Sequence, residues 1–300
     1  MVKYDVNIFL KKDIIENKNI TSEGILAYVG LVIMSENKIS RIYTSVAGIE
    51  FALKVDFEKE DRYFKEKIKR GLLNLVENNL IHIVSKKEDF KPNEIIAIRL
   101  LDFTIDTKNE YFVMVNITDI LEIARYEEKK FENEKLLRYY LVVLGTINNK
   151  SKIGYTTIEV LSDKAQVGET TVKTKYNPLL EKLRLIYISR SDIGIKYNTG
   201  EIRRISNTYG RYGDKDEIIR QAEEFKSQIV HSNFANTITG DRARSIKQKY
   251  NYFIKKMNEG YTPTKNEIDE MNGSIELYNM KYKYDTEIVE LQKIQYTYQV

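Results

Sequence analysis

The chain has no cysteine and no tryptophan, and its 300 residues include only three prolines and two histidines. Without cysteine it can form neither a disulfide framework nor a thiolate nucleophile. His82 and His231 have no second histidine or cysteine at a metal-binding spacing. We therefore expect no metal site, which excludes zinc modules and the metal-dependent nicking enzymes that carry a paired histidine motif.

Longer patterns are missing as well. No run of about 18 apolar residues occurs, and the first residues contain no uninterrupted apolar segment of the signal-peptide kind. The phosphate-loop pattern GxxxxGK[ST] is absent, which argues against an ATPase. Acidic pairs such as Glu127-Glu128 lie in charged runs typical of a solvated surface. We expect a cytoplasmic protein without membrane contact, catalytic residues or cofactor, and therefore not an enzyme.

Positive charge is unevenly distributed along the chain. The whole chain has 48 Lys and Arg against 44 Asp and Glu, a net charge of +4. Residues 169–213 alone contain nine basic and four acidic side chains, whereas residues 20–105 contain 13 of each. A local excess of positive charge suits a phosphate backbone, so the sequence predicts double-stranded DNA as the partner of residues 169–213.

The stretch from Tyr155 to Gly213 predicts a helix, a tight turn, a second helix and a two-stranded β-ribbon. Thr157 can cap the first helix, and Val167-Gly168 supplies the turn. The ribbon is expected to pair residues 185–188 with residues 201–205 across a turn at 198–200. The second helix carries an apolar stripe at helical spacing, formed by Val172, Tyr176, Leu179, Leu180 and Leu183. This is the element order of a winged helix-turn-helix.

The other face of the second helix and the ribbon supply the candidate contacts to DNA. On the helix, short hydrogen-bonding and cationic side chains suit phosphates and base edges in a major groove. The helix residues are Thr170, Thr171, Lys173, Thr174, Lys175 and Asn177, and the residues on and around the ribbon are Arg190, Lys196, Arg203, Arg204 and Arg211.

Pro178 lies inside the expected recognition helix and cannot donate a hydrogen bond to the carbonyl of Thr174. Either one helix bends at Asn177-Pro178, or a new helix begins there with Asn177 as its cap and proline at its first position. The apolar stripe continues through the proline, which favours one kinked helix.

Residues 20–105 predict a second module of the same kind. Helices are expected from about Thr21 to Met34, around Ile49, and from Asp61 to Asn79, followed by strands at 80–84 and 95–101. The phrase LLNLVENNLIHIV parallels PLLEKLRLIYIS later in the chain. Leu72 and Leu73 project about 100° apart on the third helix, so either one of them serves a second surface or both lie in one broad core. Because this module has no net charge, we expect it to mediate self-association into a homodimer.

The predicted fold class is mainly α with small β-ribbons (α+β): tandem winged helix-turn-helix domains followed by a helical C-terminal region. Within residues 214–300, Thr264 and Glu267 form a capping-box pattern. The expected divisions are 1–105 for an N-terminal arm and the first module, 106–133 for a connector, 134–213 for the second module, and 214–300 for the helical region.

This arrangement resembles the plasmid replication initiators of Gram-positive bacteria and, more distantly, the primosomal helicase loaders. The resemblance implies a plasmid or phage initiator, or an initiation accessory, that binds repeated origin DNA and recruits host replication proteins. A transcriptional or partition regulator could use the same winged helix on an operator. A third alternative is an interaction protein whose winged helices bind proteins.

Overall fold

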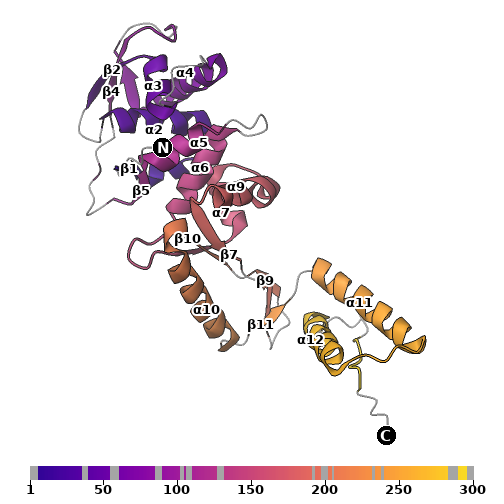
Figure 1. Cartoon of the computed structure of the whole chain (residues 1–300). Helices are drawn as coiled ribbons and strands as arrows, with labels where there is room; N and C mark the ends of the chain where they lie inside the picture. The colour runs from indigo at the N-terminus through magenta and orange to yellow at the C-terminus, as the bar shows by residue number, and fades with distance from the viewer. Residues whose placement is uncertain are drawn as a thin grey trace. The chain divides into compact units, whose positions relative to one another are not determined.

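The computed structural model has two compact parts, which are described separately (Figure 1). The first unit comprises residues 1–188 and 209–218, and the second comprises residues 189–208 and 219–300. No helix among the placed residues is long and apolar enough to cross a membrane. The structure describes residues 6–35, 40–54, 61–84, 90–101, 105, 110–126, 132–190, 193–196, 202–204, 206–231, 234–237, 240–282 and 290–295.

The first half of unit 1 combines three helices with a small sheet. Its strands are antiparallel and follow the order β2-β4-β3, so the last strand in sequence lies in the middle. The three expected helices and the two expected strands are confirmed, and the structure adds β2, which the sequence analysis missed. The elements are α2 (Ser22–Ser35), β2 (Arg41–Thr44), α3 (Val46–Lys54), α4 (Arg62–Glu77), β3 (Ile81–Ile83) and β4 (Ile96–Leu100).

The second half of unit 1 repeats this order of elements. Its sheet has the order β6-β10-β7, again with the last strand in the middle. Strand β6, with three residues, and β2, with four, were missed because such short segments give little alternating pattern. The elements are α6 (Asn133–Leu144), β6 (Gly154–Thr156), α7 (Ile158–Ala165), a helix made of α8 (Glu169–Thr171), η1 (Val172–Tyr176) and α9 (Asn177–Lys182), then β7 (Ile186–Ser189) and β10 (Asn207–Arg211).

The repeat extends to the ends of the helices. Both third helices end in a left-handed residue, Asn79 with φ 54° and Arg184 with φ 56°. In each case the next backbone N–H bonds to the carbonyl five residues back, Leu80 to Leu75 at 3.0 Å and Leu185 to Leu180 at 2.9 Å. This is a Schellman-type ending that satisfies the last carbonyls of a helix. The two halves therefore share local geometry as well as element order.

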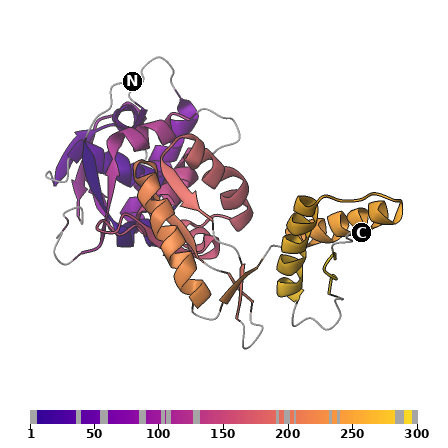
Figure 2. The same cartoon turned by 60° about the horizontal axis from the view of Figure 1, so that its bottom comes forward.

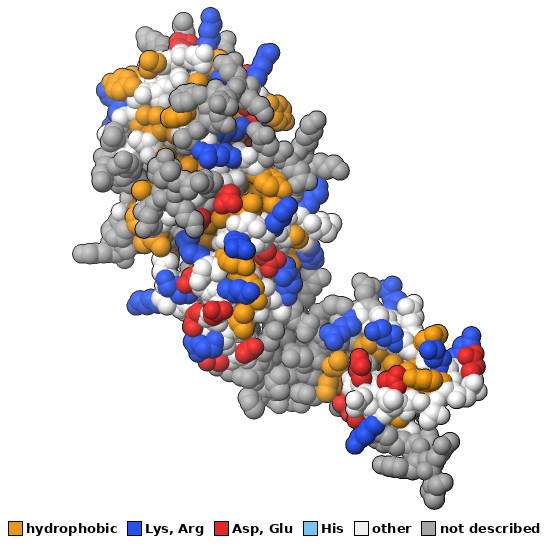
Figure 3. All heavy atoms as spheres, viewed as in Figure 1, with side chains coloured by type: hydrophobic (Ala, Val, Ile, Leu, Met, Phe, Trp, Pro, Cys, Tyr) orange, Lys and Arg blue, Asp and Glu red, His pale blue; other side chains and the backbone are white. Residues whose placement is uncertain are grey.

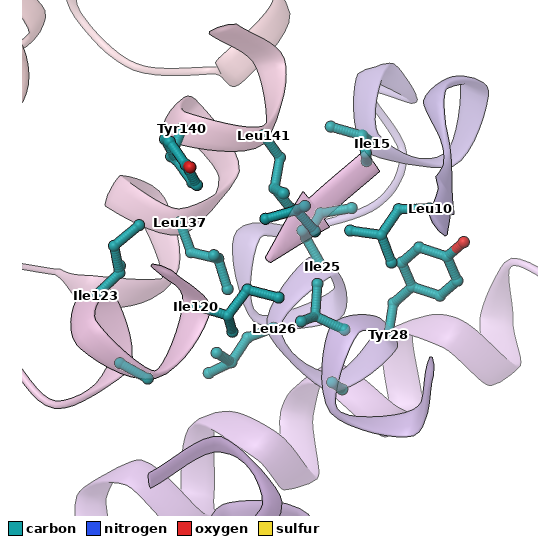
Figure 4. Packing of buried hydrophobic residues seen from close by; sticks show 14 of the residues in the cluster. Leu10, Ile15, Ile25, Leu26, Tyr28, Ile120, Ile123, Leu137, Tyr140 and Leu141 are labelled. Atoms are coloured by element: carbon teal, nitrogen blue, oxygen red, sulfur yellow. The ribbon is translucent and has the colours of Figure 1, made fainter. Parts of the chain in front are cut away.

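The two halves share one hydrophobic core. Ten of the twelve residues of α6 are buried, and α6 packs against α2, α5 (Ile117–Ala124) and α7. Figure 4 shows side chains of several of these helices gathered together, with Leu26 beside Ile120. Leu72 is fully buried, and its neighbour Leu73 packs against the same core, so neither leucine supports the expected second surface.

The expected extended N-terminal arm contains a strand that is paired within unit 1. Strand β1 (Asn7–Lys11) runs antiparallel to β5 (Phe112–Asn116), with Asn7 opposite Asn116 and Lys11 opposite Phe112. Helix α1 (Lys12–Glu16) follows directly and contacts α6. The segment expected as a connector thus supplies β5 and α5 to unit 1.

The ribbon pairs differently from the expectation. Strand β9 (Ile202–Arg204) pairs with β8 (Ile193–Lys196), whereas β7 lies next to β10. An antiparallel hairpin pairs first the residues nearest its turn. Because β8 is closer to the turn than residues 185–188, it takes β9 as its partner. The predicted pairing of 185–188 with 201–205 is therefore wrong, and the turn expected at 198–200 lies outside the described residues.

Unit 2 contains the three-stranded sheet β11-β8-β9 and a helical pair. Strand β11 (Phe234–Thr237), which runs antiparallel to β8, was missed because the region was expected to be helical. Helices α11 (Gly240–Asn258) and α12 (Lys265–Tyr282) pack against each other in both views (Figures 1 and 2). The capping box is confirmed, since Thr264 N–H bonds to Glu267 at 2.8 Å. In the sequence, η2 (Tyr212–Asp214) follows β10 and leads into α10 (Lys215–His231).

Candidate nucleic-acid interface

The candidate DNA-contacting helix begins after a tight turn at residues 166–168. Thr157 caps the preceding helix α7 by accepting a hydrogen bond from Val160 N–H at 3.3 Å. Gln166 closes α7 in the left-handed conformation, with φ 57°, and Gly168 precedes α8. The expected cap and turn are confirmed, and Gln166 supplies the left-handed residue of the turn.

Pro178 is accommodated inside one continuous helix. Tyr176 and Asn177 both have right-handed helical dihedrals, so the alternative of a helix that starts afresh at Asn177 is wrong. The N–H of Asn177 bonds to the carbonyl of Val172, five residues back, in a wide π turn. A π turn contains one residue more than an α-helical turn. It changes the backbone hydrogen-bond pattern next to Pro178, whose nitrogen cannot donate a hydrogen bond.

The outward side of this helix keeps most of the predicted contact residues. Thr170, Lys173, Thr174 and Lys175 are exposed, and Thr171 is half-buried. Thr174 donates its hydroxyl to the carbonyl of Thr170 at 2.8 Å, and Lys173 forms an ion pair with Glu169 at 2.9 Å. Within the described part of the chain, Lys175 has no ion pair, which leaves its ammonium group available to an external phosphate.

Asn177 does not belong to this exposed face. It is 3% exposed, and its Oδ1 accepts a hydrogen bond of 2.5 Å from the hydroxyl of Tyr139 on α6. The wide turn is the physical reason, because the fifth residue after Val172 comes round to the same side of the helix as Val172 itself. The predicted DNA contact of Asn177 is thus replaced by an internal one.

Arg211 is also held inside unit 1. Its guanidinium donates a hydrogen bond to the carbonyl of Met114 on β5 and lies 3.9 Å from Asp119 on α5. Asp119 in turn accepts a hydrogen bond of 2.6 Å from Tyr140. We correct the sequence-based assignment of Arg211, which stabilises the packing of β10 against β5 and α5.

The remaining predicted contacts are partly described. Arg190 is exposed directly after β7. Lys196 lies on β8, and Arg203 and Arg204 lie on β9, but the side chains of these three residues fall outside the described part of the structure.

A cation–aromatic cluster beside β7 was not anticipated. The exposed guanidinium of Arg184 lies 5.9 Å from the ring centroid of Tyr212, and the ammonium of Lys215 lies 5.3 Å from that of Tyr187. The two rings meet edge to face, with 6.5 Å between their centroids. The Arg184–Tyr212 contact joins the end of the candidate helix to the segment after β10, and the Lys215–Tyr187 contact joins β7 to the same segment. The basic residues could be counted from the sequence, but their stacking required the folded sheet.

Arg138 is the most important residue that the sequence analysis missed. Its side chain is fully buried and donates to the carbonyl of Ile20 at 2.5 Å, to that of Asn17 at 2.8 Å and to Oε1 of Gln166 at 2.9 Å. Burial lowers the pKa of Arg138 to about 10. Arg138 therefore links the turn before the candidate helix to the loop before α2. An arginine within the nearly continuous apolar run of α6 was the available signal, since a buried charge must be hydrogen-bonded.

The charge of the visible surface is mixed. Among the described side chains of unit 1 in Figure 3, Lys and Arg alternate with Asp and Glu instead of forming one continuous patch. Among the described residues, no three His, Asp or Glu side chains gather in a way that could hold a metal ion. The candidate interface thus rests on particular exposed side chains, and net charge alone would not locate it.

Comparison with family models, with curated proteins and with solved structures finds no significant match to this chain.

Proposed function

We propose that this chain is a sequence-specific DNA-binding protein whose helix α8–α9 enters the major groove of duplex DNA. The observation that carries this proposal is the exposed quartet Thr170, Lys173, Thr174 and Lys175 on the third helix of the second half. In a winged helix the third helix is the one that reads base edges. Strand β7, β10 and the ribbon β8–β9 then correspond to the wing.

The tandem winged-helix arrangement belongs to the same proposal. Two copies of one element order, each with its last strand in the middle of a three-stranded sheet, support it. The helix endings at Asn79 and Arg184 support it further, because they match in backbone conformation and hydrogen bonding. A shared architecture does not fix what a protein does, so the proposed function rests on the side chains of the site.

The lysines of α4 and those of helix α8–α9 differ in their exposure to solvent. On α4, Lys65 lies 3.8 Å from Glu50, and Lys67 forms a buried ion pair of 2.7 Å with Glu134. On the second helix, Lys173 and Lys175 are exposed. Lys65 and Lys67 are buried beside carboxylates, whereas Lys173, although paired with Glu169, and Lys175 are exposed and can reach phosphates. This contrast favours the second half as the main contact with duplex DNA.

We propose replication initiation, or assistance to it, as the biological role, with transcriptional or partition regulation as the alternative. Two linked winged helices can contact adjacent parts of a repeated site, and the helical region after them offers a surface for host replication proteins. A homodimer would present two recognition helices at a fixed spacing. A further alternative is that the same helices bind protein.

Footprinting of the full-length protein on the DNA around its own gene tests this proposal. Protection of several directly repeated sequences is expected for an initiator. One protected palindrome over a promoter would favour a regulator instead. If the protein protects no DNA even at low salt, where phosphate contacts are strongest, the DNA-binding proposal fails. Sedimentation equilibrium of the same preparation measures whether it is a dimer.

A further inference from the structure

The sheet of the first half has an outer face with an unusual row of side chains. Along β2, β3 and β4, buried and exposed residues alternate, so one face packs on the core and the other is open. The open face carries Arg41 on β2, Arg99 on β4 and His82 on β3, all exposed. Arg99 lies directly opposite Arg41 on one side and directly opposite His82 on the other.

The two arginines are held close together by the register. Leu100 N–H bonds to Ser40 at 2.8 Å, so the next pair, Arg41 and Arg99, is a non-hydrogen-bonded pair of the antiparallel ladder. Opposite residues in such pairs have Cα atoms about 4.5 Å apart and their side chains are closer than in hydrogen-bonded pairs. Like charges placed directly opposite each other destabilise a sheet. An anion bound between them would remove this repulsion.

The protein does not supply that anion from its described residues. Within those residues, the side chains of Arg41, Arg99 and His82 have no ion pair or hydrogen bond. Two lysines of the same half have carboxylate partners, Lys54 with Asp61 at 2.8 Å and Lys67 with Glu134 at 2.7 Å. The row is therefore open, and among the described residues the positive charges of Arg41 and Arg99 have no carboxylate partner.

An exposed aromatic residue lies beside the row on the same face. Tyr43, two residues after Arg41 on β2, is 68% exposed. It lies opposite Ala97, whose small side chain cannot cover the ring, and beyond Ala97 comes the exposed Val84. A cationic track next to an open aromatic ring is the combination with which proteins bind single-stranded nucleic acids, because phosphates follow the cations while bases stack on the ring.

We propose that this face binds single-stranded nucleic acid, with phosphates along Arg41, Arg99 and His82 and a base stacked on Tyr43. The inference goes beyond the proposed function, since it concerns a different surface and a single strand instead of a duplex. An acidic polypeptide would satisfy the arginines equally well, but it would leave Tyr43 without a stacking partner. The aromatic residue is what favours nucleic acid.

Fluorescence anisotropy tests the inference. Full-length protein is titrated against a labelled dT20 oligonucleotide and, separately, against a labelled duplex that contains the sequence protected in the footprinting experiment. The variant Arg41→Gln/Arg99→Gln should bind dT20 at least tenfold more weakly. Its slope of log affinity against log salt should be shallower by about 1.4, if each arginine contacts one phosphate at about 0.7 per contact. Tyr43→Ala should bind about 5-fold to 150-fold more weakly, whereas Tyr43→Phe should bind like the parent, because phenylalanine keeps the stacking face.

A matched control removes two exposed positive charges elsewhere in unit 1, with Lys150→Gln/Lys152→Asn in the turn before β6. Asparagine is chosen because residue 152 has φ 65°. This control should bind dT20 within twofold of the parent. Circular dichroism melting of each variant shows that the fold is retained. Duplex affinity of the Arg41/Arg99 variant should also stay within twofold, which separates this face from α8–α9.

The inference is overturned if the parent does not bind dT20, or if the Arg41/Arg99 variant binds it as tightly as the parent. It is also overturned if poly-glutamate displaces dT20 as effectively as unlabelled dT20 does and Tyr43→Ala has no effect, a result that would identify an acidic polypeptide as the partner. A parent that binds dT20 through this face but binds no duplex would instead refute the proposed function and leave this inference standing.

Discussion

The hydroxyl of Tyr139 donates a hydrogen bond of 2.5 Å to the side-chain carbonyl of Asn177 in the interior of unit 1. The contact fastens the π turn of the candidate DNA-binding helix to α6, the most buried helix of the unit. The rings of Tyr139 and Tyr176 also pack together, with 5.8 Å between their centroids. The position of the exposed threonines and lysines therefore depends on a polar contact beneath them.

Tyr139→Phe should lower the free energy of unfolding by about 1–3 kcal/mol, because it leaves the Asn177 carbonyl buried without a donor. Urea denaturation followed by circular dichroism measures the change. The double variant Tyr139→Phe/Asn177→Leu should recover part of the loss, since both polar partners are then absent. Tyr63→Phe on the exposed surface, where Tyr63 is 70% exposed, is the control and should change stability by less than about 0.5 kcal/mol. Equal effects of Tyr139→Phe and Tyr63→Phe would contradict the prediction.

Lys175→Ala should weaken binding to duplex DNA and reduce the slope of log affinity against log salt by about 0.9, the amount expected for one lost phosphate contact. Glu169→Gln should have the opposite effect on affinity, because it releases Lys173 from its 2.9 Å ion pair. A titration of each variant across a salt series measures both quantities, with Lys150→Gln as the control for charge loss. If all of these proteins share one affinity and one slope, the interface has been assigned to the wrong helix.

The stability of unit 1 should fall at alkaline pH. Burial raises the pKa of Tyr176 to about 12 and raises the pKa values of Tyr139 and Tyr140 well above their ordinary value. Above about pH 10 the unfolded chain loses these protons while the folded protein keeps them, so each tyrosine lowers stability by about 1.4 kcal/mol per pH unit. For Tyr176 the window runs from about pH 10 to pH 12.

Arg138 opposes this trend. Burial lowers its pKa to about 10, so the folded protein releases this proton at a lower pH than the unfolded chain does, and this group makes the fold more stable as the pH rises. A comparison with Tyr176→Phe cancels that contribution. Between pH 10 and pH 11 the parent should lose about 1 kcal/mol more of its unfolding free energy than Tyr176→Phe does. Parallel pH profiles of the two proteins would show that Tyr176 ionises normally in the fold.

Gly71→Ala should destabilise the protein by about 1–3 kcal/mol or more. A Cβ at residue 71 on α4 would lie 2.1 Å from the backbone oxygen of Glu23 on α2, so the two helices would have to separate. Gly273→Ala on α12 is the matched control, because nothing lies within 4 Å of its Cβ position. There alanine should stabilise the helix by about 0.5–1 kcal/mol. Thermal unfolding of both variants measures the contrast, and a stabilising Gly71→Ala would mean that α2 and α4 pack less closely.

Lys67→Met should cost about 3–5 kcal/mol, because it leaves the buried carboxylate of Glu134 without its partner at 2.7 Å. The double variant Lys67→Met/Glu134→Leu should be much less affected, since no uncompensated charge remains. Lys18→Met removes one partner of the exposed Lys18–Asp163 pair and should cost less than about 1 kcal/mol. Both pairs join the first half of unit 1 to the second, so burial alone distinguishes them. Equal costs for the two single variants would contradict this reasoning.

Local signals in the sequence were sufficient for most of the helices and for several of their ends. The apolar spacing along α4 and α9, the hydroxyl cap at Thr157 and the capping box at Thr264 and Glu267 are all seen in the structure. Each depends on residues within about two turns of one another, so the printed sequence already contains the interacting partners. The same local pattern indicated that residues 20–105 and 134–213 are related modules.

The sequence alone did not determine which side chains of those helices face inward. Asn177 turns to the core because a π turn inserts one residue before Pro178, and Arg211 is drawn to Met114 and Asp119, which lie about 95 positions earlier in the chain. Arg138 is buried because α6 is enclosed on nearly every side. Strand pairing, the shared core and the row of Arg41, Arg99 and His82 also depend on contacts between segments that are far apart in the sequence. Periodicity reports the face of one element, whereas burial and pairing depend on distant segments whose contacts form only in the tertiary structure.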